Sequence, residues 1–317
     1  MAAHAHGHDH PSHGHAHHHV PARDADRRWL GIALGLILGF LVVEVVAGVI
    51  AGSLALLSDA AHMLTDAGAI GLALVAARLA ARPPGGKFTF GLGRAEIVSA
   101  QINGAVLLVL AGVIGVEAIQ RLSNPPDVEG AIVLIVGLAG AVVNIGAAWA
   151  LSRAERRSLN IEGARAHVLA DLYGSLGAAL AGFLVLVADL ERADGVVALL
   201  VAALMIRSGV ALLGQSTRVL LEAAPRELDP DAIGHALASH AGVTEIHDLH
   251  VWEVTSGFPS LSAHVLVPAG SDCHATRAEL EQLLAARFGI AHSTLQVEHE
   301  AASGLLDIAP AERGDQR

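Results

Sequence analysis

Six apolar runs in the first two thirds of the chain constrain its fold more than any other feature. They lie at 30–51, 54–79, 97–119, 131–151, 166–187 and 196–213. A helix that crosses a bilayer needs about 20 mostly apolar residues, so these runs predict a bundle of six transmembrane helices. The composition agrees, because 53% of the 317 residues are hydrophobic, only 16% are charged, and the mean hydropathy is +0.53.

Beyond about residue 215 the sequence becomes polar and its periodicity changes. Helical spacing and strand alternation follow one another in the order αββαβ, over 230–240, 243–255, 260–267, 273–288 and 293–300. This order predicts a small α+β domain with an antiparallel or mixed sheet and helices on one face. The chain is therefore expected to contain a disordered tail, a transmembrane domain, a soluble domain and a second disordered tail, at 1–28, 29–214, 215–300 and 301–317.

Lysine and arginine residues near the ends of the apolar runs indicate the orientation of the chain. They gather before the first run, in 78–94, in 153–165 and at Arg218, whereas Arg121 and Arg192 lie on the opposite side. By the positive-inside rule both termini and the soluble domain are expected in the cytoplasm. The loop after the fourth run is short and lacks histidine, which favours a bacterial plasma (inner) membrane. The formal net charge of −11 gives no support to a nucleic-acid partner.

The N-terminal tail is rich in histidine, with nine of the 19 histidines of the chain in its first 19 residues. Such a tract has too little apolar surface to form a core, so it is expected to be disordered. Its imidazoles are suited to weak, exchanging contacts with borderline metal ions such as zinc. The predicted weak ligands are His4, His6, His8, His10, His13, His15, His17, His18 and His19.

Two pairs of ionisable residues interrupt the apolar runs. His62 and Asp66 lie in the second run, and His167 and Asp171 lie in the fifth, so each pair is spaced to project from one helix face. A charged side chain at the bilayer centre costs roughly 2.5–3.5 kcal/mol, which makes an ion or proton pathway the default interpretation. One pair alone could be a structural hydrogen-bonded couple, but its recurrence favours a shared metal site. Asp59 is expected to orient His62 or to lie near the outer interface.

Two imidazoles and two carboxylates are a suitable ligand set for tetrahedral Zn²⁺, at about 2.0–2.2 Å per bond. Magnesium and calcium prefer six or more oxygen ligands, so the imidazoles argue against them. The two carboxylates would cancel the charge of the ion, and protons could relieve their buried charge when the ion is absent. Metal and proton binding would then compete, as antiport requires.

These motifs together resemble the cation diffusion facilitator family, in particular its zinc-transporting branch of bacterial zinc/proton antiporters. The resemblance rests on residues 53–66, on the second His-x-x-x-Asp and on the sequence His-Asp-Leu-His-Val-Trp at 247–252, and it covers roughly 28–300. It implies a homodimer with a transport site in each protomer between the second and fifth helices. It also implies export of metal from the cytoplasm in exchange for protons, and a ferredoxin-like cytoplasmic domain that binds regulatory zinc.

For the cytoplasmic domain, the resemblance points to four histidines at positions where some relatives bind metal. These are His247, His264, His274 and His299. Because side chains alternate along a strand, His250 is expected on the face opposite to His247 and is not expected to share a metal with it.

Other positions depart from the pattern of the family. Ala301 stands where some relatives have a bridging aspartate, which argues against a fully occupied two-metal cluster. Residues 82–94 contain no His, Asp or Cys, so an additional site between the second and third helices is not expected. Cys273, the single cysteine, is interpreted as a packed or exposed thiol.

The predicted function is proton-coupled export of Zn²⁺ by alternating access, with Cd²⁺ or Co²⁺ as secondary substrates because their softness and geometry overlap. The chain is thus expected to be a secondary active transporter and not an enzyme. No catalytic cofactor is expected, and zinc is both substrate and regulatory ion. The expected partners are the lipid bilayer, a second copy of the chain, divalent metal ions and protons.

Two alternatives come from other classes of protein. One is a membrane metal sensor that does not transport. The other is a membrane zinc metalloenzyme, which would need an open water position and a separate general base; the sequence contains no His-Glu-x-x-His.

Overall fold

The computed structural model describes residues 20–51, 54–123, 130–154, 158–188, 190 and 192–300. The nine histidines of the N-terminal tail and the segment 301–317 lie outside the described residues, so their predicted roles stay predictions.

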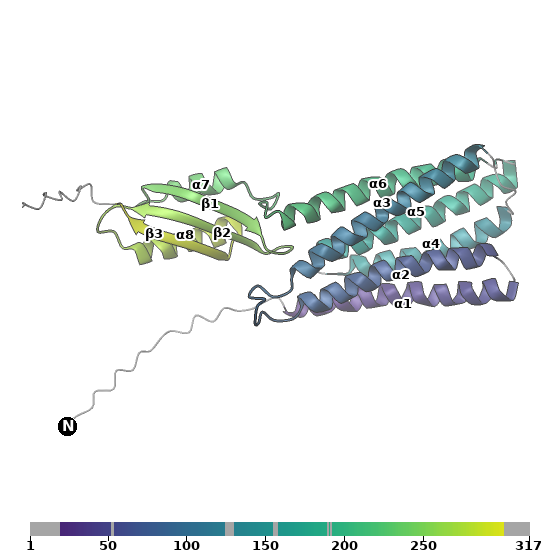
Figure 1. Cartoon of the computed structure of the whole chain (residues 1–317), viewed down its shortest axis with the longest axis horizontal. Helices are drawn as coiled ribbons and strands as arrows, with labels where there is room; N and C mark the ends of the chain where they lie inside the picture. The colour runs from purple at the N-terminus through teal and green to yellow at the C-terminus, as the bar shows by residue number, and fades with distance from the viewer. Residues whose placement is uncertain are drawn as a thin grey trace, which may run out of the picture.

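The described residues form long helices first and a small sheet domain afterwards (Figure 1). The long helices are α1 (Val20–Ala51), α2 (Leu54–Ala80), α3 (Arg94–Ser123), α4 (Gly130–Ser152), α5 (Leu159–Ala188) and α6 (Ala193–Leu220). They are followed by α7 (Pro230–Ala238), β1 (Glu245–Glu253), β2 (Pro259–Val267), α8 (Cys273–Phe288) and β3 (His292–His299).

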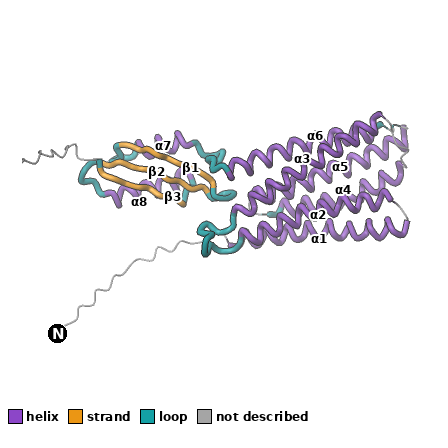
Figure 2. The backbone as a smooth tube through the Cα atoms, viewed as in Figure 1, coloured by secondary structure: helices purple, strands orange, loops and turns teal. Residues whose placement is uncertain are grey.

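The six long helices lie side by side in one bundle (Figures 1 and 2). The most extensive contacts join α3 to α6, α4 to α5 and α1 to α2, and α2 also contacts α5. Small residues allow this close packing, since a Cβ added to Gly182 on α5 would lie 2.7 Å from the carbonyl oxygen of Gly130 on α4. The contact between α2 and α5 brings together the two helices that carry the His-x-x-x-Asp pairs.

The outer surface of the bundle is apolar. Large side chains such as Val109, Ile135, Val142 and Val187 are 67–69% exposed, which suits a lipid environment better than water. Within the described residues, α3, α4, α5 and residues 195–220 of α6 are long and apolar enough to cross a membrane. At 32 and 27 residues α1 and α2 are also long, but their place among the predicted six spans stays a prediction.

Helix α1 begins before the first apolar run. Residues 20–28 were expected to belong to the disordered tail, yet they are helical and continue directly into the apolar part of α1. Asp26 is only 3% exposed, so this polar extension is partly covered by the protein. An apolar run marks the part of a helix that suits hydrocarbon, and the helix itself can continue beyond it.

The sheet domain has the predicted order αββαβ. Strand β1 pairs antiparallel with β2, and β2 pairs parallel with β3, which gives a mixed sheet in the order β1-β2-β3. Helices α7 and α8 cover one face, and their apolar residues pack on those of the strands, as with Ile233, Leu284 and Val265. The side chain of Asp272 caps α8 by accepting from the backbone N–H of His274 and of Ala275, both at 3.0 Å.

Candidate metal centre

Three of the predicted transport ligands meet inside the helix bundle. Asp66 of α2 and both His167 and Asp171 of α5 each offer one ligand atom within 4.8 Å of the other two. The residues from α5 are four positions apart, so they share one helix face, and the packing of α2 on α5 brings Asp66 to it. Asp66 is 4% exposed, His167 is fully buried and Asp171 is half-buried.

A direct contact joins two of these ligands. Nε2 of His167 lies 2.8 Å from Oδ1 of Asp66. A contact this short between a ring nitrogen and a carboxylate oxygen is a hydrogen bond in which one of the two groups donates its proton to the other. The lone pairs that would bind a metal ion are the ones engaged by this proton. A cation at the site would therefore displace the proton or be excluded by it.

The donor set fits a borderline divalent cation. One imidazole nitrogen and two carboxylate oxygens are ligands that Zn²⁺ accepts, and the two carboxylates together balance its charge. A buried dication without such compensation would be strongly unfavourable. The arrangement can bind a divalent ion and can hold one or more protons in its place.

The predicted fourth ligand, His62, belongs to α2 one turn before Asp66. Its side chain lies outside the described residues, and so does that of Asp59. Their predicted roles remain predictions.

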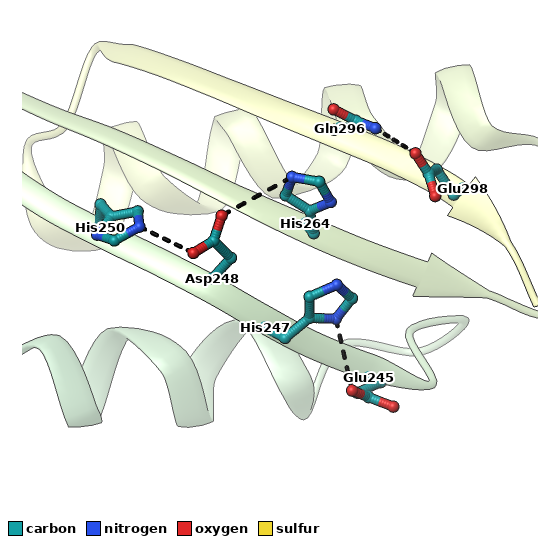
Figure 3. Close-up of polar contacts among 7 residues, drawn as sticks. All are labelled: Glu245, His247, Asp248, His250, His264, Gln296 and Glu298. Atoms are coloured by element: carbon teal, nitrogen blue, oxygen red, sulfur yellow. Dashed lines mark hydrogen bonds and ion pairs between the residues drawn. The ribbon is translucent and has the colours of Figure 1, made fainter.

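In the sheet domain, His247 and His264 form a cross-strand pair on the face that the helices do not cover. Their ring centroids are 5.2 Å apart (Figure 3). Both residues are among the four histidines to which the family resemblance points, although they are 17 positions apart in the sequence. Their proximity follows from the antiparallel register of β1 and β2.

His250 lies on the same face as His247, so the prediction from strand alternation is wrong. His247 pairs with His264 while His250 pairs with Ser262, which means that three steps along β1 match two along β2. The extra residue forms a β-bulge, in which Asp248 has a positive φ of 53°. The bulge shifts the alternation by one residue and returns His250 to the uncovered face.

Asp248 lies between histidines on this uncovered face. Nε2 of His250 is 2.9 Å from Oδ1 of Asp248, and Nε2 of His264 is 4.0 Å from Oδ2 (Figure 3). Sequence reasoning missed that Asp248 and His250 lie beside His264 on this face, because only the strand register reveals the bulge. Within the part of the chain that the structure describes, Asp66, His167 and Asp171 are the one group that brings three ligand atoms within 4.8 Å of one another.

His299 and His274 are separate from the His247–His264 pair. His299 pairs with Val267, whose side chain belongs to the core, so it lies on the helix side of the sheet. Its Nε2 is 3.4 Å from Sγ of Cys273 and 3.0 Å from the carbonyl oxygen of Ser271. His274 is exposed in the first turn of α8. Within one protomer, the four predicted histidines of this domain are therefore not brought together.

Comparisons with known proteins agree with this division of the chain. Residues 30–221 match the family described as the cation efflux transmembrane domain, and residues 225–300 match the cation efflux protein cytoplasmic domain. Among solved structures, the metal-bound C-terminal domain of the CzcD transporter from Cuprividus metallidurans is 36% identical, with 22% of this chain and 99% of that chain covered; the TM-score of 0.22 is too low to inform the fold.

Two full-length relatives illustrate the similarity. A cadmium, cobalt and zinc/H(+)-K(+) antiporter of Bacillus subtilis (strain 168) is 40% identical over 257 residues, which cover 78% of this chain and 81% of that protein. The zinc transporter ZitB of Escherichia coli (strain K12) is 37% identical over 288 residues, which cover 90% and 91%. With both domains matched and such identities over most of its length, the chain belongs to the cation efflux family, the cation diffusion facilitators.

Proposed function

We propose that this protein exports Zn²⁺ from the cytoplasm in exchange for protons. The observation that carries the proposal is the buried hydrogen bond between His167 and Asp66, because a proton shared by these two groups and a bound ion would use the same two atoms. Asp171 supplies the second carboxylate needed to neutralise a dication. Relatives named as zinc transporters and as a cadmium, cobalt and zinc antiporter support this class of substrate, with Cd²⁺ or Co²⁺ as secondary ions.

The complete transport site contains His62 as its fourth ligand. It stands four residues before Asp66 on α2, the spacing of two positions on one helix face. Two imidazoles and two carboxylates then surround Zn²⁺ tetrahedrally and leave no position for a reactive water. A closed ligand set of this kind suits transport better than hydrolysis.

Transport proceeds by alternating access. With the site open to the cytoplasm, Zn²⁺ displaces protons from the ligands. After the helices rearrange, protons from the other side displace Zn²⁺, and the protonated site returns. The ion and the protons compete for the same lone pairs and cannot bind at the same time, which couples their movements in opposite directions.

The six long helices all cross the plasma (inner) membrane, and both termini are cytoplasmic. The apolar bundle surface, the match of 225–300 to a cytoplasmic domain and the basic loops support this topology. The sheet domain is ferredoxin-like and joins two protomers into a homodimer. Its histidines bind regulatory zinc, and the histidines of the tail raise the local metal concentration at the cytoplasmic side.

Reconstituted vesicles with a zinc indicator and a pH indicator inside test the proposed antiport. Addition of Zn²⁺ to the side of the cytoplasmic domain is expected to produce zinc uptake together with proton release, both of which a proton ionophore alters. His167→Ala and Asp171→Ala remove ligands and should abolish both signals. The exposed Glu162 of α5 provides a control, since Glu162→Gln removes a carboxylate without touching the site.

Zinc uptake that survives Asp171→Ala and needs no pH gradient would refute the antiport proposal. Zinc binding without any flux in the wild-type protein would favour the metal sensor instead. A panel of Zn²⁺, Cd²⁺, Co²⁺ and Mg²⁺ in the same assay identifies the transported ions, and Mg²⁺ is expected to be excluded because it prefers six oxygen ligands.

A further inference from the structure

A stripe of buried polar residues runs along the beginning of α3. Glu96, Ser99 and Asn103 follow the spacing of one helix face and are 3%, 2% and 1% exposed. The stripe faces the bundle interior, because Nδ2 of Asn103 lies 3.5 Å from the position that a Cβ on Gly163 of α5 would occupy. Polar groups therefore continue from the end of α3 that is near the sheet domain into the bundle (Figure 1).

Several polar atoms in this region have no hydrogen-bond partner in the described part of the protein. They are Oγ of Ser99, both amide atoms of Asn103, and Oδ1 of Asn160 on α5. Asn160 is fully buried, and its Nδ2 donates to the carbonyl oxygen of Ala73 on α2 at 2.7 Å. Buried amides without partners are rare in folded proteins and call for an explanation such as water or an ion.

The position of these groups relates them to the transport site. Asn160 precedes His167 by seven residues on α5, and Ala73 follows Asp66 by seven residues on α2. The Asn160–Ala73 contact and the His167–Asp66 contact thus lie on the same α2–α5 seam, two turns or roughly 10 Å apart. The polar groups are on the side of the sheet domain, where α2 ends and α3 and α5 begin.

We propose that Ser99, Asn103 and Asn160 form a weak cation-binding site of uncharged ligands on the cytoplasmic side of the transport site. We call this site the cation station. This inference rests on the proposed function and adds an access route to it. A divalent cation that still keeps part of its water shell would contact the amide and hydroxyl oxygens before it reaches the charged ligands. Neutral oxygens suit this role, because an ion must leave each station as readily as it arrives.

In the present packing the amides of Asn103 and Asn160 are enclosed between helices, so the route is closed. Separation of α3 from α5 would let water or an ion reach them and would supply the missing partners. The closed packing is thus held less firmly than an apolar seam would be, which favours reopening.

Substitution of Asn103 separates a transport role from a structural role. Asn103→Leu removes two unpartnered amide atoms and keeps the same branching of the side chain, so the thermal unfolding temperature is expected to stay equal or to rise. Equilibrium zinc binding by the full-length protein should be unchanged. The zinc transport rate should fall by roughly tenfold or more, the effect of losing one polar contact to a charged ion. Asn103→Ser keeps an oxygen and should transport faster than Asn103→Leu.

Asn144 is the matched control, since it is a buried asparagine whose Nδ2 donates to Oγ of Ser175 at 3.4 Å. Asn144→Leu should lower stability and leave the transport rate per folded protein unchanged.

Should Asn103→Leu fail to fold, Ser99→Ala removes a smaller unpartnered group and is expected to slow transport without loss of stability. An unchanged transport rate in the folded Asn103 or Ser99 variant overturns the proposed station, and so does loss of rate only in proportion to stability. Absence of zinc flux in the wild-type protein would refute the transport function itself.

Discussion

Asp66 offers a carboxylate to a divalent ion and lies within hydrogen-bond distance of Nε2 of His167. Asp66→Asn removes the charge but keeps an oxygen that can accept from Nε2 of His167, so the fold should persist. A buried dication would then lack one balancing charge, a loss on the order of 3–5 kcal/mol for buried pairs, and zinc affinity should fall at least about a hundredfold. Equilibrium zinc titration checks this, with thermal unfolding as the test of fold. Wild-type affinity in this variant would show that Asp66 is not a ligand.

Glu253, at the end of β1, makes the stability of the sheet domain depend on pH. Burial raises the pKa of its carboxyl above the usual 4.5, the backbone N–H of Gly257 lowers it, and the nearby Glu227 raises it. Because the folded state favours the protonated form, the stabilisation is complete below the unfolded pKa and is lost as pH rises through the folded pKa. The unfolding temperature of the full-length protein should decline from about pH 4.5 upward more steeply than that of Glu253→Gln. Identical pH profiles would contradict this assignment.

At the scale of helices, the α4–α5 seam depends on the absence of a side chain at Gly182. An added Cβ would lie 2.7 Å from both the carbonyl oxygen of Gly130 and the backbone nitrogen of Leu134. Gly182→Ala therefore forces the helices apart and should cost about 1–3 kcal/mol, the usual penalty for overpacking. Gly39 on α1 is the control, because its added Cβ would meet nothing within 4 Å. Gly39→Ala should be neutral or stabilising, and equal unfolding temperatures for the two variants would contradict the prediction.

The sequence was informative about helices and strands because each has its own period. The apolar runs predicted α4 to within a residue, since its ends coincide with the ends of its apolar stretch. They missed the first turns of α1 and α5, where polar residues continue the helix outside the apolar part. The alternation of apolar and polar residues predicted strand β1 but assigned His250 to the wrong face of it. The bulge at Asp248 changes which face the following residues occupy, and no sequence pattern predicted that bulge.

The candidate site likewise combines features that residue spacing predicts with features that depend on how the helices pack. His167 and Asp171 were predictable because their spacing places two ionisable groups on one helix face inside an apolar run. That Asp66 joins them depends on α2 packing against α5, which the resemblance to a known family implied and which spacing alone could not give. The unpartnered amide of Asn103 could not be predicted at all, since hydrogen-bond satisfaction depends on every neighbouring helix.

Across the whole molecule, a small set of contacts joins the bundle to the sheet domain. Arg94, at the start of α3, donates from Nε to the carbonyl oxygen of Val254 at 3.2 Å and pairs with Glu222 at 3.1 Å. Thr255 donates from Oγ1 to the carbonyl oxygen of Gly93 at 3.0 Å. The Arg94–Glu222 pair is exposed and is expected to contribute little, whereas Thr255 is only 6% exposed. The Gly93–Thr255 contact is therefore the better place to perturb communication between the two domains.

An added Cβ on Gly93 would lie 3.0 Å from Cγ2 and 3.1 Å from Cβ of Thr255, so Thr255 would have to shift by a few tenths of an ångström. Gly93→Ala should displace Thr255 and the end of β1. Zinc transport should then slow roughly three- to tenfold, which is within the range of effects measured for mutations that alter coupling between two sites. Equilibrium binding at the Asp66 site should not change, since that site lies inside the bundle. Thr255→Ser removes Cγ2, which makes the tightest of these contacts, and keeps Oγ1, so the double variant should regain part of the transport rate. Reconstituted flux measurements on the two single variants and the double variant decide the matter: a double variant no faster than Gly93→Ala would show that the contact does not couple the domains.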